Sequence, residues 1–183
     1  MALIVETGAI IAGADSYVSA ADATTYHTAR GNTAWTGTDT VKEAALRKAA
    51  QYLDGHYRNR FKGQPVYPTT QPMAWPRAGV RLLNGPQEYY GAVPSFYDVE
   101  YSGYLAITTI PQRLKDAQCE LALIALSADL APSVSAGIKR EKVDVLETEY
   151  FAGAPAGTTV YTAVNNLLAD LLKPLNACEA VRG

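Results

Sequence analysis

The 183-residue sequence has few of the residues that build disulfide scaffolds or metal centres. Its two cysteines, Cys119 and Cys178, lack Cys-x-x-Cys spacing, so we expect two reduced thiols and no disulfide framework. Its two histidines, His27 and His56, have no histidine, cysteine or carboxylate at ligand spacing. We therefore expect no metal and no cofactor, and we place both histidines on helices as surface or half-buried residues.

Long hydrophobic runs and catalytic motifs are also missing. The densest apolar stretch, residues 121–126, is far shorter than the roughly 20 residues of a membrane span. The first residues lack the basic start and apolar run of a signal peptide, so we expect synthesis in the cytoplasm and no membrane partner. The sequence contains no nucleophile elbow, phosphate-binding loop or dinucleotide fingerprint. We expect no enzymatic activity.

A strong net charge is absent as well. The formal net charge is −2, whereas a dedicated nucleic-acid binder is usually basic. Residues 42–81 nevertheless hold eight cations and two carboxylates, a local excess of six positive charges, and aromatic residues are interleaved with them. Either the rings stack bases beside the cations, or the rings face the core and the cations meet solvent or an acidic neighbouring subunit. Helical spacing favours the second interpretation. The candidate interface or DNA-facing residues are Arg58, Arg60, Lys62, Trp75, Arg77 and Arg81.

Hydrophobic periodicity predicts four helices. The first begins at a capping box formed by Ser19 and Asp22 and ends near Gly31. The second begins at a capping box of Thr40 and Glu43 and continues to Gly63. Its apolar face is Leu46, Ala50, Leu53, Tyr57 and Phe61, and its opposite stripe is Arg47, Gln51, Asp54, Arg58 and Lys62. Gly55 inside this helix costs roughly 1 kcal/mol relative to alanine, which suggests a close neighbour or a bend.

The third helix is predicted from Pro111 to about Leu130, because proline suits the first helical position. Its buried stripe is Leu114, Ala117, Leu121, Ile124 and Ala128. The fourth helix has the apolar face Val160, Val164, Leu167, Leu168, Leu171 and Leu172. Between them, residues 139–150 alternate with a one-residue slip, which indicates a strand with a bulge.

Residues 64–109 hold six prolines and several tyrosines, so we expect an extended excursion with an irregular hairpin. Within it, Trp75-Pro76-Arg77 has two interpretations, and both can hold. As a structural device, Trp75 fills a pocket and Arg77 pairs with a carboxylate. As an interface device, both side chains are of the types enriched at binding hot spots. The expected fold is therefore mainly α: a small bundle of about four helices in one domain, 1–183, with a β-hairpin excursion and a long Pro/Tyr-rich loop.

Four phrases occur in a recognisable order. They are Ser-Tyr-Val-Ser at 16–19, Lys-Ala-Ala-Gln-Tyr-Leu-Asp at 48–54, Gln-x-x-x-Trp-Pro-Arg at 71–77 and an Ile-Pro helix start at 110–111 followed by Ala-Gln-Cys-Glu-Leu-Ala. In this order the chain resembles the head–tail connector (adaptor, or head-completion) proteins of tailed bacteriophages. Some of these proteins carry the label DnaT-like single-stranded-DNA-binding protein.

The resemblance implies a structural neck protein of the virion, assembled in the host cytoplasm. About twelve copies would form a ring between the portal protein and the tail or next neck protein, continue the DNA channel with weak contact to duplex DNA, and dock on the portal through residues 173–183. Segment 82–104 departs from the family by its length and tyrosine content. The basic stretch 42–81 and the acidic strand 141–149 could be the two complementary faces that a ring requires. The alternative is a primosome-type replication protein that binds single-stranded DNA.

Overall fold

The computed structural model describes residues 2–82, 103–131, 140–143, 146–149 and 160–174. Across these residues it contains helices α1 (Ala20–Ala29), α2 (Asp39–Tyr57), α3 (Gln112–Ala125) and α4 (Thr162–Leu168), with a 3-10 turn, η1 (Ala169–Leu171), after α4. Two antiparallel hairpins complete it: β1 (Gln64–Pro65) with β2 (Arg77–Ala78), and β3 (Arg140–Val143) with β4 (Leu146–Glu149). The expected class, a mainly α fold with a small hairpin, is confirmed. Within the same residues, no helix has the length and apolar character to cross a bilayer.

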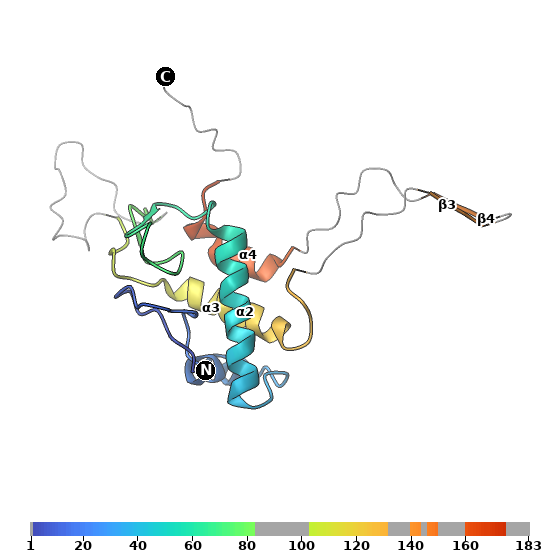
Figure 1. The fold of residues 1–183 in the computed structure, drawn as a ribbon, viewed down its shortest axis with the longest axis horizontal. Coiled ribbons are helices and arrows are strands. Elements are labelled where there is room, and N and C mark those ends of the chain that lie inside the picture. Colours follow the sequence, from blue (N-terminus) through green and yellow to red (C-terminus); the bar gives the residue numbers. More distant parts are fainter. Residues whose placement is uncertain (1, 83–102, 132–139, 144–145, 150–159, 175–183) are drawn as a thin grey trace, which may run out of the picture.

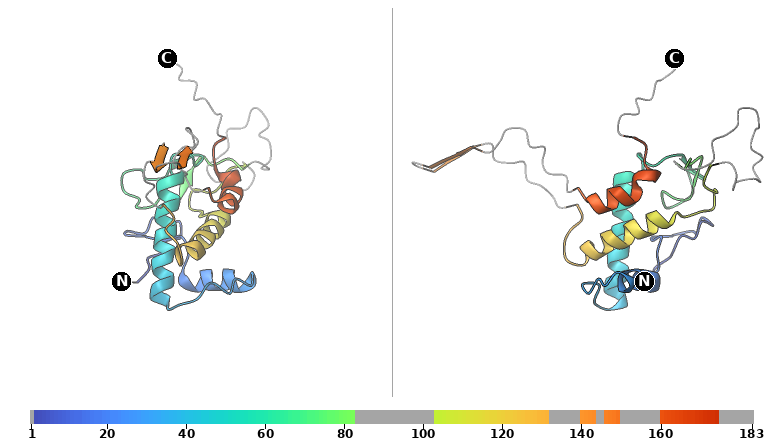
Figure 2. Two further views of the ribbon diagram at one scale, coloured as in Figure 1. Left: turned by 90° about the vertical axis from the view of Figure 1, so that its right-hand side faces the viewer. Right: turned by 180° about the vertical axis from the view of Figure 1, so that it is seen from behind.

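Helix α2 is the centre of the arrangement. It contacts α3 most extensively, α3 in turn contacts α4, and α1 packs against both α2 and α3. Seen from behind, α3 and α4 both cross α2, while α1 lies near its N-terminal end (Figure 2). In Figure 1, α2 therefore stands in front with its outer face toward the viewer. Among the described residues, helices cover one side of α2 and leave the other side uncovered.

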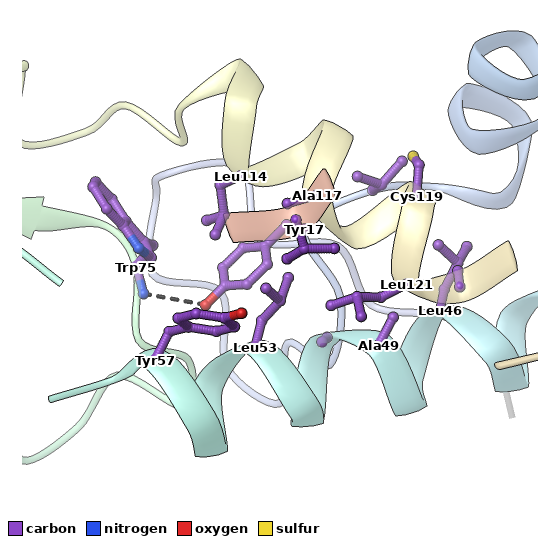
Figure 3. Close-up of a cluster of buried hydrophobic side chains, with 14 of the residues drawn as sticks. Tyr17, Leu46, Ala49, Leu53, Tyr57, Trp75, Leu114, Ala117, Cys119 and Leu121 are labelled. Atoms are coloured by element: carbon purple, nitrogen blue, oxygen red, sulfur yellow. Dashed lines mark hydrogen bonds between the residues drawn. The ribbon is translucent and has the colours of Figure 1, made fainter. Parts of the chain in front are cut away.

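The core forms where the inner faces of α2 and α3 meet (Figure 3). The predicted apolar stripe of α2 is confirmed, because all five of its residues are at most 2% exposed. On α3, Leu114, Ala117 and Leu121 are fully buried, but Ile124 is only half-buried and Ala128 is exposed. The predicted α3 stripe extends too far, since the helix ends at Ala125.

The N-termini of α1 and α2 test the two capping boxes that the sequence predicts. The Ser19 cap is confirmed, because its side chain accepts a hydrogen bond from the backbone of Asp22. The capping box predicted at Thr40 and Glu43 is wrong: Thr38 is the N-cap residue and makes no side-chain cap bond. In α4, Val160 is 67% exposed and lies before the helix, whereas Val164, Leu168, Leu171 and Leu172 are buried.

Helix α2 ends at Tyr57 and not near Gly63. Beyond it, Phe61 forms an antiparallel bridge with Leu172, and the backbone of Lys62 donates to the carbonyl of Leu171. Gly63 has a φ of +66°, and an added Cβ would collide with the carbonyl of Ala78. Pairing with these distant segments therefore competes with the helix and ends it.

The prediction that residues 139–150 form one bulged strand is wrong. β3 and β4 pair in antiparallel register, with Val143 opposite Leu146 and Arg140 opposite Glu149. The break in alternation marks a reversal of chain direction. Among the named elements, this hairpin contacts no helix and is drawn apart from the bundle in Figure 1.

A hairpin is also confirmed inside the 64–109 excursion, although β1 and β2 have two residues each. The tyrosine-rich segment 82–104 lies outside the described residues except at its ends. The same holds for the proposed docking tail 173–183 beyond Lys173 and Pro174.

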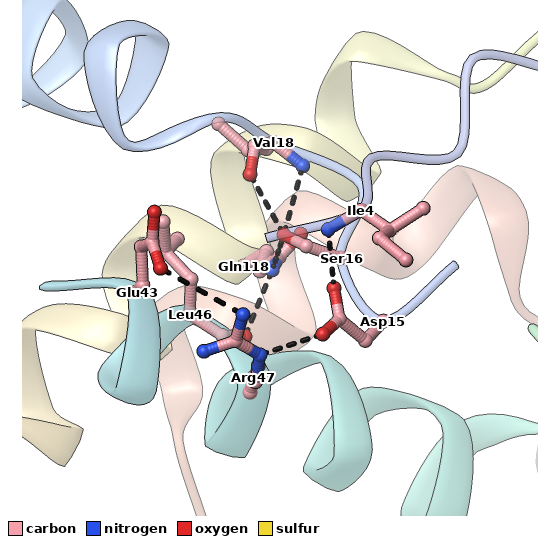
Figure 4. A network of polar contacts seen from close by, with 8 residues as sticks. All are labelled: Ile4, Asp15, Ser16, Val18, Glu43, Leu46, Arg47 and Gln118. Atoms are coloured by element: carbon pink, nitrogen blue, oxygen red, sulfur yellow. Dashed lines mark hydrogen bonds and ion pairs between the residues drawn. The ribbon is translucent and has the colours of Figure 1, made fainter. Parts of the chain in front are cut away.

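A buried polar network ties the N-terminal segment to the helices (Figure 4). Gln118 of α3 is fully buried; its Oε1 accepts from the Tyr17 backbone at 2.9 Å, and its Nε2 donates to Ser16 Oγ at 2.7 Å. Its Nε2 also donates to the carbonyl of Leu46 at 2.9 Å. One amide therefore joins three segments, which the hydrophobic pattern of α3 did not indicate.

Candidate nucleic-acid interface

Trp75 is a core residue and not a surface one. Its side chain is fully buried, and its ring meets Phe61 edge to face with centroids 5.6 Å apart. Its backbone N–H donates to the hydroxyl of Tyr17 at 3.3 Å (Figure 3). The structural interpretation of Trp75 is confirmed, and its place among the DNA-facing candidates is wrong.

Arg77 is also buried, with 4% of its surface exposed. The prediction that it pairs with a carboxylate is wrong, because its guanidinium donates to backbone carbonyls: Lys62 at 2.8 Å, Gly63 at 2.8 Å and Ala74 at 3.3 Å. Burial lowers the pKa of Arg77 from its ordinary value. These hydrogen bonds connect the turn after α2 to β2. Arg77, like Trp75, is therefore not a candidate interface residue.

Asp54 connects the loop that contains Trp75 to α2. Its carboxylate accepts from the Tyr17 hydroxyl at 2.5 Å and from the Ala74 backbone at 2.7 Å. Burial raises the pKa of Asp54, and burial together with Asp54 raises the pKa of Tyr17. The sequence pattern predicts Asp54 on the outward stripe of α2. The structure instead places it half-buried between the helix and the Trp75 loop.

The cations that remain at the surface gather at the C-terminal end of α2. Arg58 is the C-cap residue and is exposed. Arg60 is half-exposed, with its guanidinium 5.5 Å from the centroid of the Tyr57 ring. Lys62 is half-exposed and donates from Nζ to the carbonyl of Asp170 at 2.8 Å. Arg81 is exposed but lies on another segment, bridged to Tyr104.

No ion pair joins these cations to a carboxylate in the described part of the chain, although the charge of Arg58 acts on Asp54 and opposes the larger effect of burial on the pKa of that carboxyl. The ion pairs found there join Arg47 to Asp15 at 2.6 Å, Arg47 to Glu43 at 3.7 Å, and Arg113 to Asp170. None of those pairs involves the cations that follow Tyr57 or the exposed Lys48 one turn before Tyr52. The outer side of α2 therefore carries positive charge that faces solvent.

The solvent-exposed face of α2 is rotated about the helix axis relative to the polar stripe that the sequence predicts. Exposed residues recur at steps of three and four along it: Val41, Ala44, Lys48, Gln51, Gly55 and Arg58. The predicted stripe contained Arg47, which is half-buried and bonded to the N-terminal segment.

Two hollows flank this face, and sequence reasoning missed both. The first, of about 930 Å³, lies between α2 and the chain at the end of α3, residues 125–131. The second, of about 530 Å³, lies between α2, residues 14–15 and residues 72–73, and is lined by Arg58 and Asn59. The two hollows share Gln51 and Gly55.

Aromatic rings line the first hollow. The rings of Tyr52 and His56, one turn apart on α2, are stacked with centroids 5.3 Å apart and planes 10° apart. Tyr161 meets Tyr52 edge to face at 5.4 Å. Burial, and next the charge of Arg60, lower the pKa of His56. The four-residue spacing of Tyr52 and His56 was the signal that could have identified this pair.

The described residues contain no cluster of three or more potential metal ligands. Burial raises the pKa of the Cys119 thiol to about 12, which removes it as a nucleophile at neutral pH. The prediction that His27 lies at or near the surface is wrong: it is fully buried, its ring is 4.5 Å from that of Trp35, and its Nδ1 lies 3.0 Å from the Asn32 side-chain amide. These residues pack the core.

A protein-family model matches the whole chain, residues 1–183, and its description is "Putative DnaT-like ssDNA binding protein". No curated protein and no solved structure matches. The DnaT-like label predicted from the four sequence phrases is confirmed, whereas the head–tail connector assignment stays a prediction. Since the match covers every residue, the chain belongs to the DnaT-like single-stranded-DNA-binding protein family.

Proposed function

We propose that this protein binds single-stranded DNA through the cations on the outer side of α2, as a primosome-type replication protein would. The observation that carries the proposal is the family match over the full length of the chain. The exposed Arg58 and the half-exposed Arg60 support it, because neither forms an ion pair among the described residues and both remain accessible to phosphates. Among the described residues, no helix covers the outer side of α2, which leaves room for a strand beside them (Figure 1).

The expected affinity is moderate and depends strongly on salt. The net charge of −2 gives no long-range attraction to DNA. Of the rings in the basic stretch, Tyr57, Phe61 and Trp75 are buried and cannot stack on bases. Phosphate contacts therefore supply most of the binding, and we expect a dissociation constant near the micromolar end of the non-specific range, roughly 10⁻⁶–10⁻⁴ M at physiological salt.

Neutralising two of these cations should lower both affinity and its salt dependence. For single strands, the slope of log K against log salt falls by about 0.7 for each phosphate that the protein no longer neutralises. The double change Arg58→Gln and Arg60→Gln should therefore reduce the slope by about 1.4. The measurement is fluorescence anisotropy of a labelled oligothymidylate titrated with the full chain at several salt concentrations.

The matched control removes two cations near the N-terminal end of α2, by Arg30→Gln and Lys42→Gln. Arg30 lies 3.5 Å above the Tyr26 ring and Lys42 lies 5.8 Å from the Trp35 ring, away from the C-terminal end of α2. The control should keep the wild-type slope. Equal losses in both double variants would mean that general charge, and not this surface, binds DNA. Absence of binding by the wild-type chain at low salt would reject the proposed function.

A second candidate is a phage neck subunit in a ring of about twelve copies between the portal and the tail or next neck protein. One observation favours it: β3–β4 contacts no helix among the named elements, and an isolated two-stranded hairpin is marginal in water. A hairpin of this kind needs a partner to pack against. Rings use two different complementary faces on each subunit, and the cationic side of α2 could receive the acidic segment of a neighbour. Such a protein would occupy the virion and contact channel DNA weakly.

Reversing the charge of Arg58 should then weaken the ring. Arg58→Glu places an acid on the proposed receiving face, so the oligomer should dissociate at protein concentrations where the wild type stays assembled. Multi-angle light scattering and electron microscopy, with and without the portal, measure the size of the assembly. Arg30→Glu is the control, because Arg30 lies at the end of α1. A wild-type chain that remains a monomer in both conditions would reject this candidate.

A further inference from the structure

Nothing in the described residues explains the glycine at position 55. It lies in the interior of α2 and is exposed, and a Cβ added there would meet nothing within 4 Å. The close neighbour expected from the sequence is therefore absent from the described residues. A glycine in a helix interior is unfavourable, so its presence where alanine would fit points to something that approaches α2 from outside.

The position of Gly55 links the two hollows. Both are lined by Gln51 and Gly55. The hollow of about 930 Å³ lies on one side of these two residues, and the hollow of about 530 Å³ lies on the other. Because Gly55 has no side chain, the surface of α2 comes closest to the helix backbone at this position. A long, thin ligand can therefore pass from one hollow to the other over the backbone of α2.

Each hollow carries a cation suited to phosphate. Lys48 lines the first hollow beside Asp129, and Arg58 lines the second beside Asp15 and Asp54. Both cations are exposed, and Asp15 is already paired with Arg47. They are ten residues apart on one stripe of α2, a separation of about 15 Å along the axis. That separation leaves room for a short segment of one nucleic-acid strand between the two cations.

The first hollow also offers a place for a base. Tyr52 and His56 already form a parallel stack there, and His56 is exposed. The Tyr57 ring also meets His56 edge to face, with centroids 4.7 Å apart. An unpaired base can stack on the exposed part of the His56 ring, whereas a base paired within a duplex cannot. The combination of stacked rings and separated cations fits one unpaired strand.

We propose that a single strand of DNA crosses α2 at Gly55, with phosphates held by Lys48 and Arg58 and a base stacked on His56. This site deepens the proposed function and rests on it. It explains why a residue unfavourable to helices occupies an exposed helix interior. It also adds three residues, Lys48, Gly55 and His56, to the surface that the sequence indicated.

The deciding variant is Gly55→Leu, in the full chain. Leucine favours the helix, so the melting temperature should rise by roughly 2–4 °C. The same side chain fills the crossing point, so affinity for labelled oligothymidylate should fall by roughly tenfold or more. Ala44→Leu is the matched control, because Ala44 lies on the same exposed stripe of α2 but lines neither hollow. It should bind as the wild type does.

A second variant tests the stacked base. His56→Ala should weaken binding of the single strand by roughly fivefold or more and leave binding of the matching duplex unchanged. If His56→Ala weakened the binding of single-stranded and duplex DNA equally, the proposed contact between His56 and a base would be wrong.

The outcomes separate this site from the proposed function. Loss of oligonucleotide binding in a more stable Gly55→Leu protein supports the crossing. Wild-type affinity in Gly55→Leu overturns the crossing while leaving DNA binding intact. If the variant keeps DNA binding but loses self-assembly in light scattering, the surface around Gly55 docks protein and the inference is wrong. If the wild type binds no oligonucleotide, both proposals fail.

Discussion

Replacing Trp75 by alanine is expected to lower the free energy of unfolding by about 3–5 kcal/mol. Trp75 is fully buried, packs edge to face on Phe61 and lies against the end of α2. Removing the indole leaves a cavity that Phe61 and the loop backbone cannot refill without breaking the hydrogen bonds from Arg77 to backbone carbonyls. Since domains of this kind are stable by only about 5–15 kcal/mol, the change removes a large part of the total.

Urea unfolding followed by far-ultraviolet circular dichroism measures the effect. Tyr67→Ala is the matched control, because Tyr67 is an aromatic of the same loop that is 56% exposed. It should change stability by no more than about 0.5 kcal/mol. A decrease below about 1 kcal/mol in Trp75→Ala would show that the indole is dispensable to the core, and Trp75 would again be a candidate for the interface.

The second large effect is expected at Gln118. In Gln118→Leu, the backbone N–H of Tyr17 loses its acceptor while it stays buried, which costs about 1–3 kcal/mol. Ser16 Oγ keeps its hydrogen bonds with the backbone of Val18 and is affected less. Tyr17 also donates to Asp54 from its hydroxyl, so a shift of the Tyr17 backbone disturbs the hydrogen bonds that hold the Trp75 loop as well.

Thermal unfolding monitored by circular dichroism tests this prediction. Gln112→Leu, an exposed glutamine in the first turn of the same helix, is the control and should leave the melting temperature nearly unchanged. Equal melting temperatures for Gln118→Leu and the wild type would contradict the linking role of the amide. A decrease restricted to Gln118→Leu would establish that one polar side chain joins the N-terminal segment to both central helices.

The variants Trp75→Ala and Gln118→Leu also give a prediction for DNA binding. Trp75 and Gln118 line neither hollow, so at temperatures where the variants remain folded they should bind DNA as the wild type does. The cations at the end of α2 depend on the loop for their placement, because Lys62 and Gly63 are held by Arg77. Any decrease in binding should therefore follow unfolding and not precede it.

The apolar stripe of α2 and the cap at Ser19 could be predicted because both depend on residues three or four positions apart. The end of α2 could not, since Phe61 leaves the helix to pair with Leu172, far along the chain. The burial and the hydrogen-bond partners of the charged residues were the hardest features to predict from the sequence. Arg77 and Asp54 have the sequence pattern of solvent-facing residues, yet the loop folds over them and supplies backbone partners.

The candidate site was predicted in part. Arg58 lies at the surface at the end of α2, and Arg60 and Lys62 are half-exposed in the turn that follows the helix. The hollows on either side of Gly55 were missed, since their walls come from residues 14–15, 72–73 and 125–131. No local pattern brings these segments to α2.

The sequence by itself determined the approximate positions of α1 to α4, the apolar stripe of α2 and the concentration of positive charge in residues 42–81, because periodicity and charge are local properties of the chain. Only the tertiary structure decided which polar groups meet, which rings remain exposed and where the surface is hollowed. Those features depend on contacts such as that between Ser16 and Gln118, 102 residues apart, whose geometry is fixed only when the segments pack together.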